Sequence, residues 1–272
     1  MKQWLFFYCM LLAAYSGAQT DSAVAQAERY WRKAASESLG SPLRQRLLDS
    51  ALLLEPTNAY YYQQKAMPLF KQQKCEAGMP YLDSAVKYNR ERYLPYRAFM
   101  KCMFQRSYRD ALTDFNAAKR LDSVAYVMDH PYDFYIAICY LQLNNIDAAD
   151  VYINKCINER RKKFGNNLDH YMHFFYKGII EMEKENYLKA ATIFDTAIKL
   201  YPRFSDAKYY KAVCFEKTDD YEQAILLMKE AYDDISNKYT IAEDNVIHER
   251  YPYQIKPEWV EANLEPMQEK KK

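Results

Sequence analysis

Glycine is scarce in this sequence: its 272 residues include only five. The glycine-rich loops that cradle phosphate in nucleotide-binding folds are missing, because neither GxGxxG nor GxxxxGK(S/T) occurs. No surplus of one charge predicts a nucleic-acid partner, since 38 basic residues stand against 36 acidic ones. A mean hydropathy of −0.54 with 27% charged residues argues against a protein with many membrane spans. The 50% of hydrophobic residues argues against disorder.

Long apolar runs are also rare, and the clearest one lies near the N-terminus. Residues 4–15 are largely apolar, Lys2 precedes them, and Ser16-Gly17-Ala18 follows. A basic start, a short apolar stretch and small residues form the layout of a secretory signal peptide over residues 1–18. We therefore expect cleavage after Ala18 and export to the periplasm or the outer membrane. Two minority interpretations are a lipoprotein modified at Cys9 and an uncleaved membrane anchor.

Cysteines at metal-binding or redox spacing are absent as well, because no CxxC occurs. Exported proteins often contain disulfides, but the five cysteines that remain after cleavage are odd in number and irregularly spaced. We expect them to be small apolar core residues, with at most one or two bridges that the sequence does not assign. They are Cys75, Cys102, Cys139, Cys156 and Cys214.

What the sequence does contain is a repeated spacing of small residues. Gly178, Ala190 and Ala197 are separated by twelve and then seven positions. The spacing recurs at Ala212, Ala224 and Ala231, at Ala137, Ala149 and Cys156, at Ala66, Gly78 and Ala85, and more loosely at Phe99, Ala111 and Ala118. A large apolar residue lies between the second and third position of every copy: Leu82, Phe115, Ile153, Phe194 and Met228. Small residues let two antiparallel helices approach closely, and large ones fill the space to the next pair.

This pattern resembles the tetratricopeptide repeat, a helix-turn-helix unit of about 34 residues. Successive copies are 33, 38, 41 and 34 residues apart, so the two long steps place extra residues near 124–130 and 162–169. No copy keeps the family's Trp, and Glu181 replaces an apolar residue. The resemblance covers about residues 21 to 234. It implies an all-α fold, a right-handed superhelical solenoid of about six antiparallel helix pairs.

The local signals place these helices along the chain. We expect the solenoid over residues 19–235 and a C-terminal extension over residues 236–272, which packs in part on the solenoid and ends in a frayed tail. A short capping helix is expected at 257–264. Few turns should need a positive φ, which would account for the scarcity of glycine. The expected pairs are 21–38/42–54, 58–73/75–89, 93–105/108–120, 131–143/147–160, 168–184/187–200 and 204–217/221–235.

The resemblance also implies a binding surface, because the first helices of such pairs line a concave face that usually binds peptides. Positions three before, one after and four after the first small residue should point there. Thirteen of these fifteen positions are apolar or aromatic, a larger patch than a soluble monomer usually exposes. The residues that we expect to bind a partner are Tyr96, Phe134, Phe175, Tyr209, Met67, Met100, Phe70, Met103, Leu141 and Met182.

Three explanations for this apolar face stay open: an apolar or aromatic partner segment binds it, the chain's own C-terminus fills it, or superhelical winding or a homodimer covers it. The second has a candidate in residues 241–266, where aromatics and prolines alternate with polar residues. A cell-surface glycan is an alternative ligand, because aromatics beside basic residues stack on sugars. A clamp for acidic chaperone tails is not expected, since Gln63 and Met67 replace its Lys, Asn and Arg side chains.

Catalytic motifs and complete metal motifs are missing. His170 and His173 are three residues apart, but no third His or carboxylate completes a motif, so we expect surface or stacking histidines. Glu181 and its acidic neighbours are expected on a solvated helix flank. No GxSxG occurs, and no cysteine has a recognisable catalytic partner. The sequence thus predicts a non-enzymatic protein–protein interaction scaffold of the bacterial envelope, without a cofactor, a metal or a nucleic-acid partner.

Overall fold

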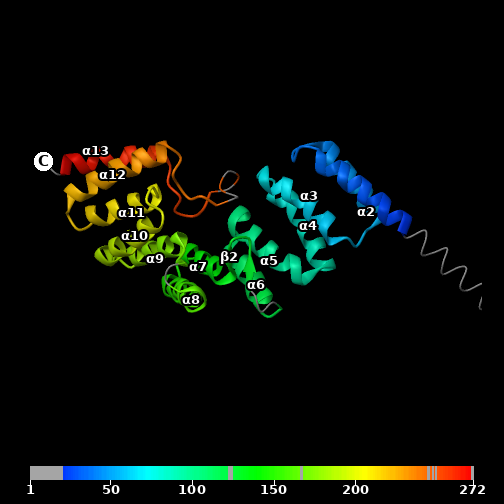
Figure 1. Ribbon diagram of the computed structural model, residues 1–272, viewed down its shortest axis with the longest axis horizontal. Coiled ribbons are helices and arrows are strands. Elements are labelled where there is room, and N and C mark those ends of the chain that lie inside the picture. Colours follow the sequence, from blue (N-terminus) through cyan, green and yellow to red (C-terminus); the bar gives the residue numbers. More distant parts are fainter. Residues whose placement is uncertain are drawn as a thin grey trace, which may run out of the picture. The chain divides into compact units, whose positions relative to one another are not determined.

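The computed structural model describes residues 21–121, 125–165, 168–243, 246, 248 and 250–270. Within them, helices follow one another in packed antiparallel pairs (Figure 1). The chain divides into two compact units, an N-terminal unit up to residue 97 and a C-terminal unit from residue 98. The predicted signal peptide, residues 1–18, lies outside the described residues. No helix within the described part of the chain is long and apolar enough to cross a membrane.

The first described element of the N-terminal unit is a helix over residues 21–36. It continues with α2 (Pro42–Leu54), α3 (Ala59–Lys71), α4 (Cys75–Tyr88) and the greater part of α5 (Arg90–Met100). The start of α2 follows the capping rule, because the Ser41 hydroxyl accepts from the Arg44 N–H and Pro42 occupies the first turn. Asn58 caps α3 in the same way.

The C-terminal unit has more elements, and it ends in a helix that packs on the last pair. Figure 1 shows α13 beside α12, in agreement with their packing contacts. The elements in chain order are η1 (Lys101–Gln105), α6 (Tyr108–Lys119), β1 (Tyr126–Val127), β2 (His130–Pro131), α7 (Tyr132–Gln142), α8 (Ile146–Phe164), α9 (Tyr171–Glu183), α10 (Tyr187–Leu200), α11 (Ser205–Glu216), α12 (Tyr221–Ser236) and α13 (Pro257–Lys270).

These bounds confirm the predicted all-α fold and its helix pairs to within a few residues. Two local features were not predicted. A π-helical turn, η1, continues α5, and a two-stranded antiparallel hairpin precedes α7, with Tyr126 opposite Pro131. The predicted capping helix exists as α13 and is longer than expected.

The small residues of the repeat are buried, as the spacing predicts. The two glycines among them show how closely the helices approach. A Cβ atom on Gly178 would lie 2.5 Å from the Phe194 ring, and one on Gly78 would lie 2.7 Å from the Phe70 ring. Both phenylalanines are fully buried, so neither ring has free space into which it can move.

The turns inside the helix pairs correct one expectation, because positive φ values recur there without glycine. Five residues before the second small position of each copy stands a left-handed residue with φ between 57° and 62°. The next N–H closes the turn onto the end of the first helix; for example, the Asn186 N–H donates to the Glu181 carbonyl at 2.9 Å. The left-handed residues are Gln73, Arg106, Asn144, Glu185 and Asp219. Scarce glycine therefore does not mean scarce left-handed turns.

Candidate functional site

The predicted partner-binding residues differ in how exposed they are to solvent. Met67 and Tyr96 in the N-terminal unit are half-buried, as is Met182 in the C-terminal unit. The others are buried: Phe70, Met100, Met103, Phe134, Leu141, Phe175 and Tyr209. Phe134 stacks on His130 with ring centroids 4.0 Å apart, and Phe175 contacts Phe204 at 5.1 Å. These phenylalanines therefore fill the space between successive helices, and their role in partner binding stays a prediction.

A tyrosine recurs two positions before the first small residue in three repeats of the C-terminal unit. These side chains, Tyr135, Tyr176 and Tyr210, all lie one position after the predicted ones. The Tyr176 hydroxyl donates to the Pro252 carbonyl at 2.9 Å, and Tyr210 contacts the Tyr253 ring at 5.9 Å. The first helices α9 and α11 thus carry part of the C-terminal segment, which we define as the residues from 237 to 270.

Asp206, in the first turn of α11, accepts hydrogen bonds from the backbone of the same segment. Its carboxylate accepts from the Ile255 N–H at 2.8 Å, the Ile241 N–H at 3.2 Å and the Thr240 hydroxyl at 2.7 Å. Asp206 is fully buried. Burial raises its pKa to about 6, although the hydrogen bonds that it accepts favour the ionised form.

Helix α13 closes the end of the last helix pair. Val260 and Met267 are fully buried in one cluster with Tyr209 and Met228. The Asn263 side-chain amide donates to the Tyr209 hydroxyl at 3.1 Å. Tyr209 therefore packs against the chain's own C-terminal helix.

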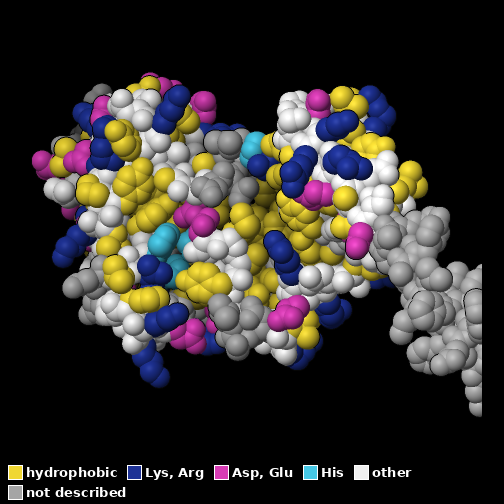
Figure 2. All heavy atoms as spheres, turned by 45° about the vertical axis from the view of Figure 1, so that its right-hand side comes forward, with side chains coloured by type: hydrophobic (Ala, Val, Ile, Leu, Met, Phe, Trp, Pro, Cys, Tyr) yellow, Lys and Arg dark blue, Asp and Glu magenta, His cyan; other side chains and the backbone are white. Residues whose placement is uncertain are grey.

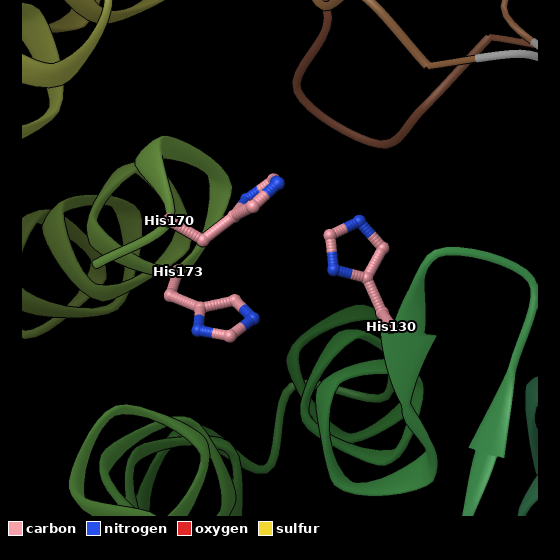
Figure 3. Close-up of side chains that lie close together, drawn as sticks. All are labelled: His130, His170 and His173. Atoms are coloured by element: carbon pink, nitrogen blue, oxygen red, sulfur yellow. The ribbon is translucent and has the colours of Figure 1, made fainter. Parts of the chain in front are cut away.

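Three histidines of the C-terminal unit point toward one another (Figure 3). His130 extends from β2, whereas His170 and His173 come from the cap and the first turn of α9. One side-chain nitrogen from each ring lies within 4.8 Å of the others. This contact corrects the expectation that no third histidine joins His170 and His173.

The histidine cluster is buried, and part of it lacks hydrogen-bond partners. His130 is 1% exposed and His173 is 2% exposed. Among the described residues, no group hydrogen-bonds to either ring nitrogen of His173. Burial, followed by the neighbouring His130, lowers the pKa of His170 to about 4 and that of His173 well below its usual value.

A carboxylate from the C-terminal segment lies beside one histidine of the cluster, His130. Glu243 is buried, and its Oε1 atom lies 3.4 Å from Nε2 of His130. The same oxygen accepts from the Tyr171 hydroxyl at 3.3 Å. Burial opposes the ionised form of Glu243, but His130, His170 and Tyr171 outweigh it and lower the pKa. Imidazole nitrogens with a carboxylate are a donor set that divalent transition metals take in proteins.

A cleft of about 730 Å³ lies beside the cluster, and His173 forms part of its wall. Ala125, the hairpin, α6, α7 and α8 supply the rest of the lining, including Lys155 and Glu159. Inside it, the buried Asp133 pairs with Lys119 and Lys155. Figure 2 shows histidine side chains at the surface of the same unit, beside acidic ones. His170 is half-buried, so the cluster is not sealed from solvent.

A buried charge in α9 corrects another expectation. Glu181 is 1% exposed rather than solvated. Lys177 and Lys189 pair with its carboxylate at 2.8 and 2.9 Å, and Asn186 donates a hydrogen bond. Burial opposes ionisation, but these contacts outweigh it and lower the pKa of Glu181 to about 2. The residue stabilises the turn of its own repeat.

Comparison with known proteins identifies the repeat. Residues 177–239, which span α10, α11 and α12, match the family model of the tetratricopeptide repeat. This part of the chain therefore belongs to the tetratricopeptide repeat family, and the helix pairs of the described residues share its fold. Tetratricopeptide proteins bind peptide or protein partners and are in general non-enzymatic, so the fold suggests a protein–protein interaction scaffold.

Solved structures agree with this fold. A tetratricopeptide repeat protein from Parabacteroides merdae is 14% identical, with a TM-score of 0.59 over 92% of this chain and 98% of that chain. PilW, a type IV pilus biogenesis factor, is 11% identical, with a TM-score of 0.59 over 80% of this chain and 94% of that chain. Pseudomonas aeruginosa PilF is 13% identical, with a TM-score of 0.55 over 80% and 97%. No curated protein matches the sequence significantly.

Sequence reasoning missed the tyrosine positions, His130 and Glu243. The tyrosines carried a usable signal, because they recur at a fixed distance from the small residues. His130 lies on a hairpin and Glu243 in a segment without periodicity, 40 and 73 residues from His170. No spacing rule relates residues that far apart when the connecting backbone is irregular.

Proposed function

We propose that this tetratricopeptide protein is a non-enzymatic scaffold that binds an apolar or aromatic segment of a partner protein through the N-terminal unit. The binding face would lie on the first helices α3 and α5. The observation that supports this choice is the exposure of the predicted residues: Met67 and Tyr96 stay half-buried, whereas most equivalents in the C-terminal unit are fully packed. An apolar partner side chain gains most from contact with apolar surface that is still accessible.

The C-terminal segment has a different role in this proposal. It fills the first-helix face of the C-terminal repeats with the chain's own residues, through Tyr176, Tyr210 and Asp206. In this proposal, the chain's own C-terminal segment covers the first helices of the C-terminal repeats, and a partner segment covers those of the N-terminal unit. The occupied face also indicates the kind of segment that such helices accept, an extended one with aromatic and proline side chains.

Site-specific photo-crosslinking tests the proposal. A photoreactive residue at position 67 should capture a partner, whereas one at Leu53, 83% exposed on α2, should not. The cross-linked peptide then serves as a purified ligand. Met67→Glu should weaken its binding by about tenfold or more in calorimetry, because a charge enters an apolar contact. Leu53→Glu is the matched control. Equal affinity of wild type and Met67→Glu would place the binding surface elsewhere.

We further propose that the scaffold works in the cell envelope, in an assembly or export machine. The support is the pattern of residues 1–18, together with the likeness of the fold to PilW and PilF. N-terminal sequencing of the protein from a periplasmic or membrane fraction should begin at Gln19. A mature chain that begins at Met1 in the cytosol would contradict this location.

A further inference from the structure

The stacking of the helix pairs does not by itself require that histidine side chains cluster together. The chain has four histidines, and three of them meet in one buried place. Helix packing needs apolar contacts at such positions, and an imidazole nitrogen without a partner costs free energy there. Neither ring nitrogen of His173 has a hydrogen-bond partner among the described residues, whereas Nε2 of His130 has the Glu243 carboxylate at 3.4 Å. The nitrogens of His173 need a further group to satisfy them.

The cluster offers donor atoms of the kinds that tetrahedral metal sites use. We propose that His130, His170 and His173 bind one divalent transition-metal ion of the zinc type, with the Glu243 carboxylate as the fourth ligand. Three imidazoles and one carboxylate suit this class of ion better than calcium or magnesium, which prefer oxygen donors. The one carboxylate also offsets part of the ion's charge in a buried site.

The geometry requires a modest closure of the rings. Two ligands on one tetrahedral zinc ion lie roughly 3.4 Å apart, whereas the histidine nitrogens lie within 4.8 Å of one another. Rotation of the side chains would have to close a difference of up to about 1.4 Å. Nε2 of His130 is already 3.4 Å from the Glu243 carboxylate, which matches the separation of two ligands.

One existing contact bears on the ligand atom of His170. Its Nδ1 accepts a long hydrogen bond of 3.3 Å from the Met172 N–H. A neutral imidazole has a single lone pair, so coordination by His170 must end this hydrogen bond. A change at the Met172 amide therefore reports metal binding by His170.

The site would join three parts of the C-terminal unit that are far apart in sequence. His130 belongs to the hairpin, His170 and His173 to α9, and Glu243 to the C-terminal segment. An ion that binds the folded chain and not the unfolded one stabilises that fold. The metal site does not depend on the partner-binding proposal, because its ligands lie outside the N-terminal unit.

Titration of the untagged, chelator-treated full chain tests the site. Zn²⁺ added in competition with a chromogenic chelator should bind at one ion per chain, with a Kd of micromolar or lower. Co²⁺ should give the intense visible absorption of a tetrahedral complex. Saturation with Zn²⁺ should raise Tm by roughly 5 °C or more. A chain that binds neither ion stoichiometrically would overturn the proposal.

Substitutions assign the ligands. His130→Phe and His173→Phe keep an aromatic ring in the core and should each weaken Zn²⁺ binding at least about 100-fold. Glu243→Gln should weaken it about tenfold or more. His248→Phe, which removes the one histidine outside the cluster, is the matched control and should bind as wild type does. Wild-type affinity in folded His173→Phe would refute the assignment.

Nuclear magnetic resonance of the wild-type chain keeps the test decisive if a variant does not fold. With ¹⁵N-labelled histidine, Zn²⁺ should shift the imidazole resonances of three histidines and leave that of His248 in place. The Met172 amide resonance should shift at the same stoichiometry. Shifts confined to His248, or none at one equivalent of Zn²⁺, would contradict the proposed ligands.

Discussion

The N-terminal and C-terminal units use the same small-residue spacing but differ two positions before the first small residue. In the C-terminal unit this position holds Tyr135, Tyr176 and Tyr210, whereas in the N-terminal unit it holds Gln64 and Arg97. Spacing therefore determines how helices stack, and the residue at this neighbouring position determines what covers the first-helix face.

The side chains at this position make different kinds of contact in the two units. In the N-terminal unit, Gln64 accepts from the buried Arg44 at 2.9 Å and Arg97 pairs with Asp83 at 2.7 Å, so both serve contacts within their unit. In the C-terminal unit, Tyr176 and Tyr210 contact the C-terminal segment. A tyrosine offers a broad apolar ring and one hydroxyl, which suits an extended backbone.

The largest expected effect comes from Asp206→Ala. The substitution leaves the buried N–H groups of Ile241 and Ile255 without their acceptor, which should lower the free energy of unfolding by roughly 2 to 4 kcal/mol. Hydrogen exchange should accelerate at both amides while α3 and α4 in the N-terminal unit stay protected. Asp195→Ala, which removes an exposed carboxylate of α10, is the control. Unchanged exchange at Ile241 and Ile255 would mean that Asp206 does not hold the segment.

A smaller effect is expected from two glycine substitutions, one in each unit. Gly78→Ala and Gly178→Ala bring a methyl group against Phe70 and Phe194 at 2.7 and 2.5 Å. Each should lower the unfolding free energy by about 1 to 2 kcal/mol in urea titration, because the clash exceeds the gain in helix propensity. Similar losses would confirm that close packing of a glycine against a buried ring stabilises both units to a similar extent. Stabilisation of either variant would contradict this.

The smallest predicted effect is a pH dependence limited to the C-terminal unit. The pKa of Asp206 is about 6 in the folded chain, above the ordinary value of 3.8. A raised carboxyl pKa means that Asp206 contributes most stability when protonated, and that this contribution falls as pH rises from about 4 through 6. Relative to Asp206→Asn, the wild type should lose about 1 kcal/mol between pH 5 and pH 7. Parallel stability curves for the two proteins would contradict the raised pKa.

Helix positions were predictable because each repeat contains its own information. Small residues at twelve-then-seven spacing and caps such as Ser41-Pro42 act within about 34 residues of sequence. The burial of Phe134 and Phe175 was harder to predict, because the concave-face positions of the family also contact the next helix when their side chains are large. A shift of one helical position, from Phe175 to Tyr176, turns a side chain by about 100°.

The left-handed residues inside the helix pairs explain how this chain manages with few glycines. A residue with a side chain in that conformation carries roughly 1 kcal/mol of steric strain. Glycine avoids the strain but loses roughly 0.5 to 1 kcal/mol more conformational entropy on folding. The two costs nearly cancel, so each junction tolerates Gln, Arg, Asn, Glu or Asp, as Gln73 and Arg106 illustrate. The junctions are thus free to vary in charge, while the positions of Gly78 and Gly178 are fixed by the rings beside them.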